Sequence, residues 1–495
     1  MRMSELHAAV GRLRDEIARE GAATLRLWTP VLRRRAFTPA ATNLACYLAL
    51  RRRDIRRLQE GLSALGLSSL GRSEAGVLAA LDAVRDTLAC LVRPGGRRRP
   101  VAAVQARGHR AIARAQQRIF GADPLGPRTR IMMTMPAEAA TNRALVRRML
   151  EAGGDCARIN CAHDDPDVWR AIIANVRREA AAAGRACAVL MDLGGPKVRL
   201  TKVAPAGKIR LLRGDRFELV EAPLRKREAR VQAVVSHAEI VRRLVPGATV
   251  WVDDGKLGAR VIEAGDGRAV LEVTHARDRG ERLRAEKGIN LPGVELDIPA
   301  LTAQDLEALD FVAAHADCIG YSFVQRPEDV VQLQQELARR RRGKPLPPVV
   351  LKIETALAVR NLPRLIVTAG GRQPVAVMIA RGDLAVEIGL ARLSEIQEQI
   401  LWICEAAHVP VIWATQVLDS LVRDGAASRS EATDAAMGQR AECVMLNKGP
   451  HQVEAIRFLD EVLRRMDRHQ LKKSPRLAPL GSWSEPQTLP AALAP

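Results

Sequence analysis

The sequence lacks paired cysteines, and no CxxC motif occurs among its 8 cysteines. Most of them lie in apolar, strand-like stretches, such as those around Cys156, Cys318 and Cys443. This pattern is typical of reduced core cysteines and argues against a disulfide framework or a zinc site.

Long apolar runs are also missing from the sequence. No stretch is long enough to span a bilayer, and the N-terminus opens an amphipathic segment without the apolar core of a signal peptide. We therefore expect a soluble, cytoplasmic protein with no membrane partner.

Lysine is absent before Lys197, and arginine greatly outnumbers lysine in the whole chain. The net charge is +21, and a basic chain can bind polyanions or phosphorylated metabolites. A coding bias towards Arg and Ala would give the same composition, so nucleic acid is not an expected partner. With 495 residues, 47% of them hydrophobic, the chain can form a large core and more than one domain.

Residues 1–122 contain no visible catalytic motif. Apolar residues recur there at helical spacing, as in Leu44–Leu50 and Val77–Leu81. We predict an α-helical N-terminal extension that packs on the main domain or on another subunit. The alternative is a surface that binds polyanions through the basic residues of these helices. The stretch Gly121–Pro127, rich in Gly and Pro, marks a domain boundary.

From residue 128 onward, short apolar strands alternate with amphipathic helices. The eight predicted strands are Arg130–Met135, Ala157–Cys161, Cys187–Asp192, Cys318–Val324, Val349–Glu354, Val375–Ala380, Pro410–Ala414 and Cys443–Leu446. This alternation predicts the α/β class and a (β/α)8 TIM barrel, with its first part at 128–199 and its second part at 288–468.

Residues 200–287 interrupt this alternation with short strands and turns. Examples are Arg216–Val220, Thr249–Gly255 and Ala269–Val273. We predict an inserted small β-barrel lid domain after strand 3, over the face where barrel enzymes have their active sites. Residues 469–495, rich in Pro, Leu and Ser, are expected to form a disordered tail.

Three charged residues lie at the ends of two neighbouring predicted strands. Lys352 and Glu354 are two residues apart, so their side chains share one side of a strand. Asp383 follows the end of the next strand. A lysine and two carboxylates that converge at the C-terminal face form a candidate site for Mg²⁺ and an anionic substrate. Taken alone, the same residues could be solvated surface charges.

Seven short motifs occur in a fixed order along the predicted barrel. They are Ala157–His163 (A-R-I-N-C-A-H), Met191–Arg199 (M-D-L-G-G-P-K-V-R), Val252–Gly255, Lys287–Gly293 (K-G-I-N-L-P-G), Lys352–Glu354 (K-I-E), Ala380–Leu384 (A-R-G-D-L) and Ala414–Gln416 (A-T-Q). With them, the chain from Thr129 to about Met466 resembles the pyruvate kinase family. The resemblance implies a Mg²⁺-dependent transfer of phosphoryl from phosphoenolpyruvate to ADP, which gives pyruvate and ATP.

The resemblance also implies roles for residues around the substrate. Glu354 and Asp383 would hold Mg²⁺, which Mn²⁺ could replace. Lys352, Arg158 and Thr415 would be catalytic, the first two at the phosphoryl group and the third on the proton-delivery path. A final group would bind the substrate: Arg381, Gly382, Asp383 and Thr415.

The nucleotide would be held by charges of the lid and the barrel, because the sequence has neither a Walker A motif nor a kinase-type glycine loop. By resemblance, the nucleotide-side residues are Asn160, His163, Arg199, Lys287 and Asp254.

Several positions depart from the family pattern. Asn160 and Asp192 of the monovalent-cation site remain, but the serine is Ala162 and a glutamate is Lys197. Family members with lysine there do not need potassium, so we predict that K⁺ is not required. The loops at 134–138 and 446–450 also differ. No counterpart of the family's C-terminal effector domain is present, so we expect no sugar-phosphate regulation.

Two other functions stay open from the sequence. The barrel could keep a Mg²⁺–enolate site but perform lyase or aldolase chemistry on a 2-oxo acid. It could also be a non-catalytic regulator or nucleic-acid binder built around the basic extension. We expect a homo-oligomer in each case.

Overall fold

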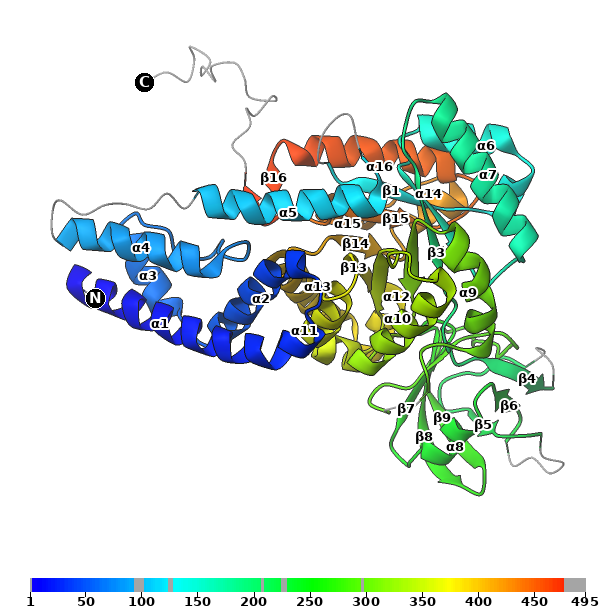
Figure 1. Ribbon diagram of the computed structural model, residues 1–495. Coiled ribbons are helices and arrows are strands. Elements are labelled where there is room, and N and C mark those ends of the chain that lie inside the picture. The colour runs from blue at the N-terminus through cyan, green and yellow to red at the C-terminus, as the bar shows by residue number, and fades with distance from the viewer. Residues whose placement is uncertain are drawn as a thin grey trace, which may run out of the picture.

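A closed barrel of eight parallel strands forms the centre of the computed structural model (Figure 1). The structure describes residues 2–92, 102–122, 128–205, 209–223, 229–294 and 298–475. The barrel strands are β1 (Arg130–Thr134), β2 (Cys156–Asn160), β3 (Ala188–Asp192), β11 (Cys318–Tyr321), β12 (Val349–Ile353), β13 (Val375–Ala380), β14 (Val411–Ala414) and β15 (Cys443–Leu446). Their order around the barrel follows the chain, and β15 closes on β1.

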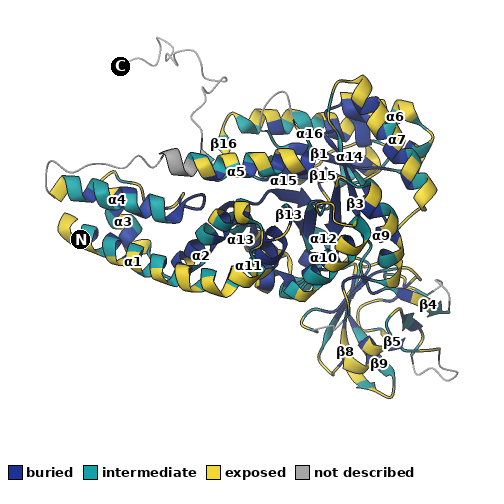
Figure 2. Cartoon of the chain, in the orientation of Figure 1, coloured by how far each residue is buried: buried dark blue, intermediate teal, exposed yellow. Residues whose placement is uncertain are grey.

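All eight predicted strands are confirmed, and no end differs from the prediction by more than three residues. Both faces of the barrel strands are buried, and Figure 2 shows these strands in dark blue. Strands buried on both faces have largely continuous apolar sequences. One predicted strand ends early. β11 stops at Tyr321 because Phe323 has a φ of 53°, which no strand can accommodate.

Helices surround the barrel and cover its outer face (Figure 1). They are α6 (Arg143–Glu151), α7 (Pro166–Ala182), α9 (Ala303–His315), α10 (Pro327–Arg341), α11 (Ala356–Gly370), α12 (Arg381–Ile388), α13 (Leu390–Ala406), α14 (Asp419–Asp424), α15 (Arg429–Gly438) and α16 (Gln452–Asp467), with the 3₁₀ helix η3 (Ala137–Ala140) after β1. Five of them, α6, α7, α9, α11 and α15, start at a side chain that caps the first turn. The Thr355 hydroxyl accepts a hydrogen bond from Ala358 N, so α11 begins directly after β12 and Glu354.

The insertion after β3 is a seven-stranded sheet with its own apolar core. Its elements are β4 (Leu200–Ala204), β5 (Arg216–Val220), β6 (Gln232–Val235), α8 (Glu239–Arg243), β7 (Thr249–Val252), β8 (Leu257–Gly265), β9 (Arg268–His275) and β10 (Ile289–Asn290). The sheet starts at β10 and ends at β4, and a bridge between Arg199 and Gly288 joins the two edges next to the barrel. Backbone hydrogen bonds of Leu200 with Glu286 and Lys287 join the same two edges, so the sheet closes on itself here as expected for a small barrel.

The N-terminal helices lie at the opposite end of the molecule from the inserted sheet (Figure 1). They are α1 (Met3–Trp28), the 3₁₀ helices η1 (Thr29–Val31) and η2 (Arg35–Phe37), α2 (Thr38–Arg51), α3 (Arg56–Ala64), α4 (Val77–Val92) and α5 (Ala102–Phe120). The prediction of a helical extension that packs on the main domain is confirmed. The Asn43 amide, for example, donates hydrogen bonds to Glu74 O at 2.7 Å and to Ala406 O of α13 at 2.8 Å.

Helix α5 closes the floor of the barrel. Ile119 and Phe120 are each 1% exposed and pack with the side chains that fill the barrel interior, including Cys156 and Cys443. Upstream on the same helix, the Gln116 amide donates to Arg128 O and Glu442 O, just before β1 and β15. The extension therefore contributes part of the barrel core itself.

The prediction of a disordered tail is wrong for residues 469–475. These residues form a short hairpin of β16 (Gln470–Leu471) and β17 (Ser474–Pro475). Lys472 pairs with the buried Glu442, and Lys473 pairs with the buried Glu74, so two lysines anchor the hairpin. Residues 476–495 and 123–127, to which the other expectations for linkers and tail apply, lie outside the described residues.

All 8 cysteines are unpaired, as predicted. In the described part of the chain, no helix combines the length and the apolar character that a membrane span requires.

Candidate active site

A cavity of about 190 Å³ opens at the C-terminal face of the barrel, next to the start of the inserted sheet. Ends of β2, β12, β13 and the loops after β3, β11 and β14 supply its walls. Nine of its lining residues were predicted from the sequence as site residues: Arg158, Asn160, His163, Lys197, Arg199, Lys352, Glu354, Asp383 and Thr415. The strand ends of the barrel thus bring together side chains that are far apart in the chain.

Asp192 lies below the cavity and is fully buried at the end of β3. Its Oδ2 accepts hydrogen bonds from Arg158 Nε at 2.9 Å and from Lys352 Nζ at 3.2 Å. Burial alone would raise the pKa of Asp192, but the charges of Lys352 and Arg158 hold it below its ordinary value. Gly320 on β11 leaves the room that this carboxylate needs, because a Cβ there would collide with it.

The Lys352 ammonium is a buried charge that faces the cavity. It donates to Ser322 Oγ at 2.6 Å and lies 3.3 Å from Glu354 Oε1. Burial would lower the pKa of Lys352, yet Asp192 and Glu354 raise it above the ordinary value, so the lysine stays charged. A fixed cation in a site of low dielectric interacts strongly with an anionic ligand.

Glu354 and Asp383 place two carboxylates on this cavity. Glu354 is 3% exposed, and its Oε2 accepts a hydrogen bond from Phe323 N at 2.5 Å. Burial raises the pKa of Glu354, and the Asp383 carboxylate raises it further, against the effect of Lys352. The pair therefore carries negative charge that a cation in the cavity would stabilise.

The inserted sheet reaches the cavity through ion pairs. Lys197 Nζ lies 2.9 Å from Asp383 Oδ1 and 3.5 Å from Asp254 Oδ1. Beside it, Lys287 Nζ lies 2.9 Å from Asp253 Oδ1. Burial would lower the pKa of Lys197, but Asp383 and Asp254 raise it, so this lysine is charged as well. The insertion is thereby linked to a carboxylate of the barrel.

Thr415 is held in an unusual conformation at the end of β14. Its φ is 65°, its Oγ1 accepts from Gly382 N at 2.7 Å, and the same hydroxyl donates to Ala414 O. Arg381 supports this turn: its guanidinium donates to Ala414 O and Thr415 O, each at 2.9 Å. Asp434 on α15 binds the same guanidinium with both carboxylate oxygens, and Trp413 lies against its face.

The family model described as the barrel domain of pyruvate kinase matches residues 126–454. The chain belongs to the pyruvate kinase family. A pyruvate kinase of Agrobacterium vitis is 34% identical over 354 residues, which are 69% of this chain and 69% of that protein. A pyruvate kinase of Methylorubrum extorquens is 34% identical and covers 70% of each chain. Pyruvate kinase 2 of Synechocystis is 31% identical over 71% of this chain and 58% of its own length.

A solved structure supports the same family. The crystal structure of a pyruvate kinase from Cryptosporidium parvum matches with a TM-score of 0.61 at 26% identity, over 72% of this chain and 70% of that chain. The predicted family and fold are confirmed, and with them the prediction that the chain is an enzyme of the kinase class.

Some residues expected at the site lie beside it. Arg381 and Gly382 are engaged in the contacts around Thr415. Lys287 pairs with Asp253 within the insertion, and Asp254 pairs with Lys197. Lys197, expected near Asn160 and Asp192, instead has its ammonium on Asp383. These positions make Arg381 a residue that supports the site rather than one that faces the cavity.

Sequence reasoning missed two side chains. Ser322, fully buried, accepts from Lys352 and donates to Leu193 O at 2.6 Å. Asp434 holds Arg381 from a helix that begins well after β14. The Ser322–Phe323 pair at the end of a predicted strand was a weak signal for the first; nothing in the sequence connected Asp434 with Arg381.

Proposed function

We propose that this protein transfers the phosphoryl group of phosphoenolpyruvate to ADP in a Mg²⁺-dependent reaction, giving pyruvate and ATP. The observation that carries the proposal is the convergence of Lys352, Glu354 and Asp383 with Arg158 on one cavity, in a chain of the pyruvate kinase family. Phosphoryl transfer depends on positioning and charge neutralisation more than on covalent chemistry, and these four side chains supply both.

Lys352 and Arg158 would bind the phosphoryl group during transfer. Both are held by Asp192 Oδ2, so their positive charges point to one place without prior reorganisation. Ser322 fixes the lysine from the other side. The network keeps Lys352 charged and holds Lys352 and Arg158 in place at the cavity.

The carboxylates of Glu354 and Asp383 fit a magnesium ion. Mg²⁺ is usually bound by one or two carboxylates and completes its shell with water and substrate oxygens. In the described part of the chain, no three acidic, histidine or cysteine side chains form a closed metal site, and two carboxylates on an open cavity match that preference. Bound there, the ion would neutralise charge on the phosphate and the enolate oxygen.

Thr415 would take part in delivering a proton to the enolate carbon that phosphoryl transfer leaves behind. Its hydroxyl lines the cavity at the end of β14 and already exchanges hydrogen bonds with Gly382 N and Ala414 O. The backbone of Gly382 and Asp383, at the start of α12, would meet the substrate carboxylate.

The nucleotide would lie between the barrel and the inserted sheet, which we infer acts as a lid. Asn160, His163 and Arg199 line the cavity on this side. Lys287 and Asp254 lie in the sheet, where closure would bring them towards the phosphates. Excluding water in this way strengthens every charge interaction inside the site.

A coupled assay of pyruvate formation from phosphoenolpyruvate and ADP, with and without Mg²⁺, tests the proposal. We expect activity that requires both ADP and the metal. Binding of oxalate, an enolpyruvate mimic, without binding of ADP would instead support lyase or aldolase chemistry and overturn the kinase proposal.

We predict that K⁺ does not stimulate the reaction. Lys197 places a permanent ammonium 2.9 Å from Asp383 at the edge of the cavity, where it can supply the positive charge that a monovalent cation would otherwise bring. Activity in tetramethylammonium buffer should equal activity with K⁺, and Lys197→Glu should create a requirement for K⁺. A steep rise of wild-type activity on adding K⁺ would contradict this prediction.

Asp434→Asn is expected to lower kcat about tenfold with little change in KM. Without the carboxylate, the guanidinium of Arg381 loses its bidentate partner and holds the Thr415 turn less firmly. Steady-state kinetics of pyruvate formation measure the effect, and a misplacement of this kind typically acts on turnover. Asp424→Asn, an exposed acid on α14, is the matched control; equal kcat in both variants would refute the supporting role.

A further inference from the structure

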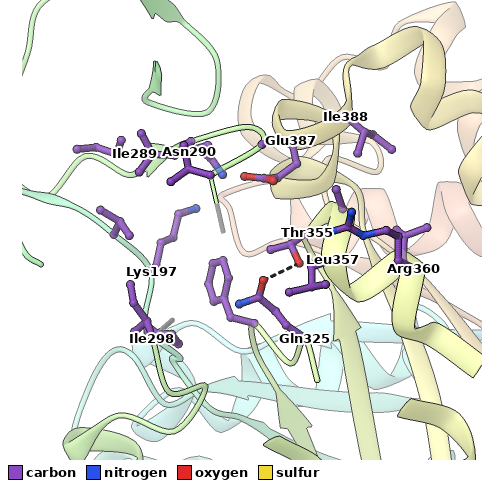
Figure 3. A pocket seen from close by; sticks show the side chains of 18 of the residues that line it. Lys197, Ile289, Asn290, Ile298, Gln325, Thr355, Leu357, Arg360, Glu387 and Ile388 are labelled. Atoms are coloured by element: carbon purple, nitrogen blue, oxygen red, sulfur yellow. Dashed lines mark hydrogen bonds between the residues drawn. The ribbon is translucent and has the colours of Figure 1, made fainter. Parts of the chain in front are cut away.

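A second cavity, of about 320 Å³, lies next to the candidate active site (Figure 3). One wall is the segment that returns from the lid, around Ile289 and Leu291, and the opposite wall is formed by the starts of α11 and α13. Lys197 and Phe323 line both cavities, so they form the partition between them. Most of the remaining lining is aliphatic, Arg360 and Arg392 are its basic members, and the volume is within the range of small-molecule sites.

Glu387 brings a carboxyl group into this apolar cavity. Figure 3 shows its carboxylate directed inwards, towards Asn290. In the described part of the chain no basic side chain forms an ion pair with it, and only the backbone of Ala356 donates a hydrogen bond. Burial, with the Asp383 charge one turn earlier on α12, raises the pKa of Glu387 to about 7. A partly buried carboxylate in such a cavity is stabilised when a ligand brings a positive charge to it.

Asn290 supplies a second acceptor at the same place. The side chain is 7% exposed, its Nδ2 donates to Asp383 Oδ1 at 3.5 Å, and its Oδ1 is buried without a hydrogen-bond partner in the structure. A buried carbonyl oxygen normally has a donor. Among the described residues, Asn290 Oδ1 has no donor and the Glu387 carboxylate has only the backbone of Ala356, so both acceptors can take a further hydrogen bond from the cavity.

The neighbouring ammonium group does not satisfy these acceptors. Lys197 Nζ is taken by Asp383 and Asp254. On the cavity floor, the Thr355 hydroxyl donates to Gln325 Oε1 at 3.2 Å, so these two polar groups satisfy each other. Arg360 and Arg392 also line the cavity, but among the described residues neither forms an ion pair with Glu387. Glu387 and Asn290 Oδ1 can therefore both accept hydrogen bonds from a compact, positively charged donor in the cavity.

We propose that this cavity binds a small amphipathic amine, whose primary ammonium donates to the Glu387 carboxylate and Asn290 Oδ1. Its hydrocarbon part would lie against Leu357 on α11 and Ile396 on α13, which line the cavity opposite the lid segment. An ammonium has three donors and a charge, which matches two acceptors of which one is ionised. The aliphatic walls select a ligand with an apolar body over a bare ammonium ion or a metal ion.

Such a ligand would act on the position of the lid. Asn290 belongs to β10, which pairs with β7 of the lid, and its amide also contacts Asp383 of the barrel. An ammonium bound to Asn290 and Glu387 would hold the return segment against α12, and so would favour one arrangement of lid and barrel over others. The site is thus placed to regulate the neighbouring one, while its existence does not depend on which reaction occurs there.

Calorimetric titration of the full-length protein with hexylammonium chloride tests the proposal, with sodium hexanoate as a probe of equal length and opposite charge. We expect hexylammonium to bind in mildly alkaline buffer and hexanoate not to bind. Glu387→Gln should weaken hexylammonium binding at least roughly tenfold, as for the loss of one charge-assisted contact. Glu395→Gln, which changes an exposed acid on α13, is the matched control and should leave binding unchanged.

A second variant tests whether the ligand occupies the cavity, without changing the Glu387 carboxylate. Leu357→Trp fills the cavity and keeps Glu387, so it should abolish binding of hexylammonium if the ligand lies where we propose. Unchanged binding in both Glu387→Gln and Leu357→Trp, equal binding of hexanoate, or no binding of hexylammonium at millimolar concentration would each overturn the proposal. Because the readout is binding, failure here would leave the proposed phosphoryl transfer untouched.

Discussion

Replacing Lys352 with methionine is expected to lower kcat for pyruvate formation by about a thousandfold, the upper end of what one preoriented charge contributes. The variant keeps the length of the side chain and removes its charge. In the wild type this ammonium lies among Asp192, Ser322 and Glu354 and faces the cavity. Without it, only Arg158 would remain to meet the phosphoryl group from this side.

The same substitution should also destabilise the protein. Glu354 would lose its nearest cation, and Asp192 would keep only Arg158. Breaking a buried ion pair costs about 3–5 kcal/mol, so thermal unfolding must be measured beside kcat. Lys344→Met, at an exposed lysine after α10, controls for the change of residue type. A folded Lys352→Met protein with kcat within tenfold of wild type would show that the lysine is not part of the catalytic site.

Glu354→Gln is expected to weaken divalent-metal binding by on the order of 100-fold, since even residues that only orient metal ligands contribute 10–100-fold. The amide keeps the shape of the side chain and can still accept the hydrogen bond from Phe323 N, but it removes half of the carboxylate pair. Electron paramagnetic resonance of free Mn²⁺ measures the affinity directly, and the Mg²⁺ dependence of kcat gives an independent value.

The thermal stability of Glu354→Gln should change in the opposite direction to that of Lys352→Met. Burial and Asp383 raise the pKa of Glu354, so its negative charge is unfavourable in the metal-free protein and the neutral amide should unfold at the same or a higher temperature. Glu328→Gln, at an exposed acid of α10, is the control. Unchanged Mn²⁺ affinity in Glu354→Gln would exclude this carboxylate as a metal ligand.

The barrel could be predicted from the sequence because buried parallel strands leave a simple pattern. Runs such as Val349–Leu351 and Val375–Ala380 are apolar on both faces, and helices of ordinary length separate most of the strands. The hairpin at 470–475 could not be predicted in the same way. Its polar composition favours disorder, and only the tertiary partners Glu442 and Glu74 give its lysines a fixed place.

Site residues could be predicted from the sequence where their spacing matches the two-residue period of a strand. Lys352 and Glu354 are two apart at a strand end, and that spacing alone places them together. Asp434 and Asn290 are different, because each acts through a contact between elements that are distant in sequence. The family resemblance put Lys197 at the monovalent-cation site with Asn160 and Asp192, whereas in the structure its ammonium lies beside Asp383. This position depends on the side-chain rotamer, which the sequence does not give.

Helix α5 leaves the ribosome early, but the surface that buries its end is completed late. Ile119 and Phe120 belong to one buried cluster with residues from all eight barrel strands, and the last of these in the chain, Cys443 and Met445, belong to β15. During synthesis, the apolar end of this helix therefore stays exposed until most of the chain has been made. Extension and barrel must complete their folding as one cooperative unit, and a barrel expressed without α5 would begin with an open apolar floor.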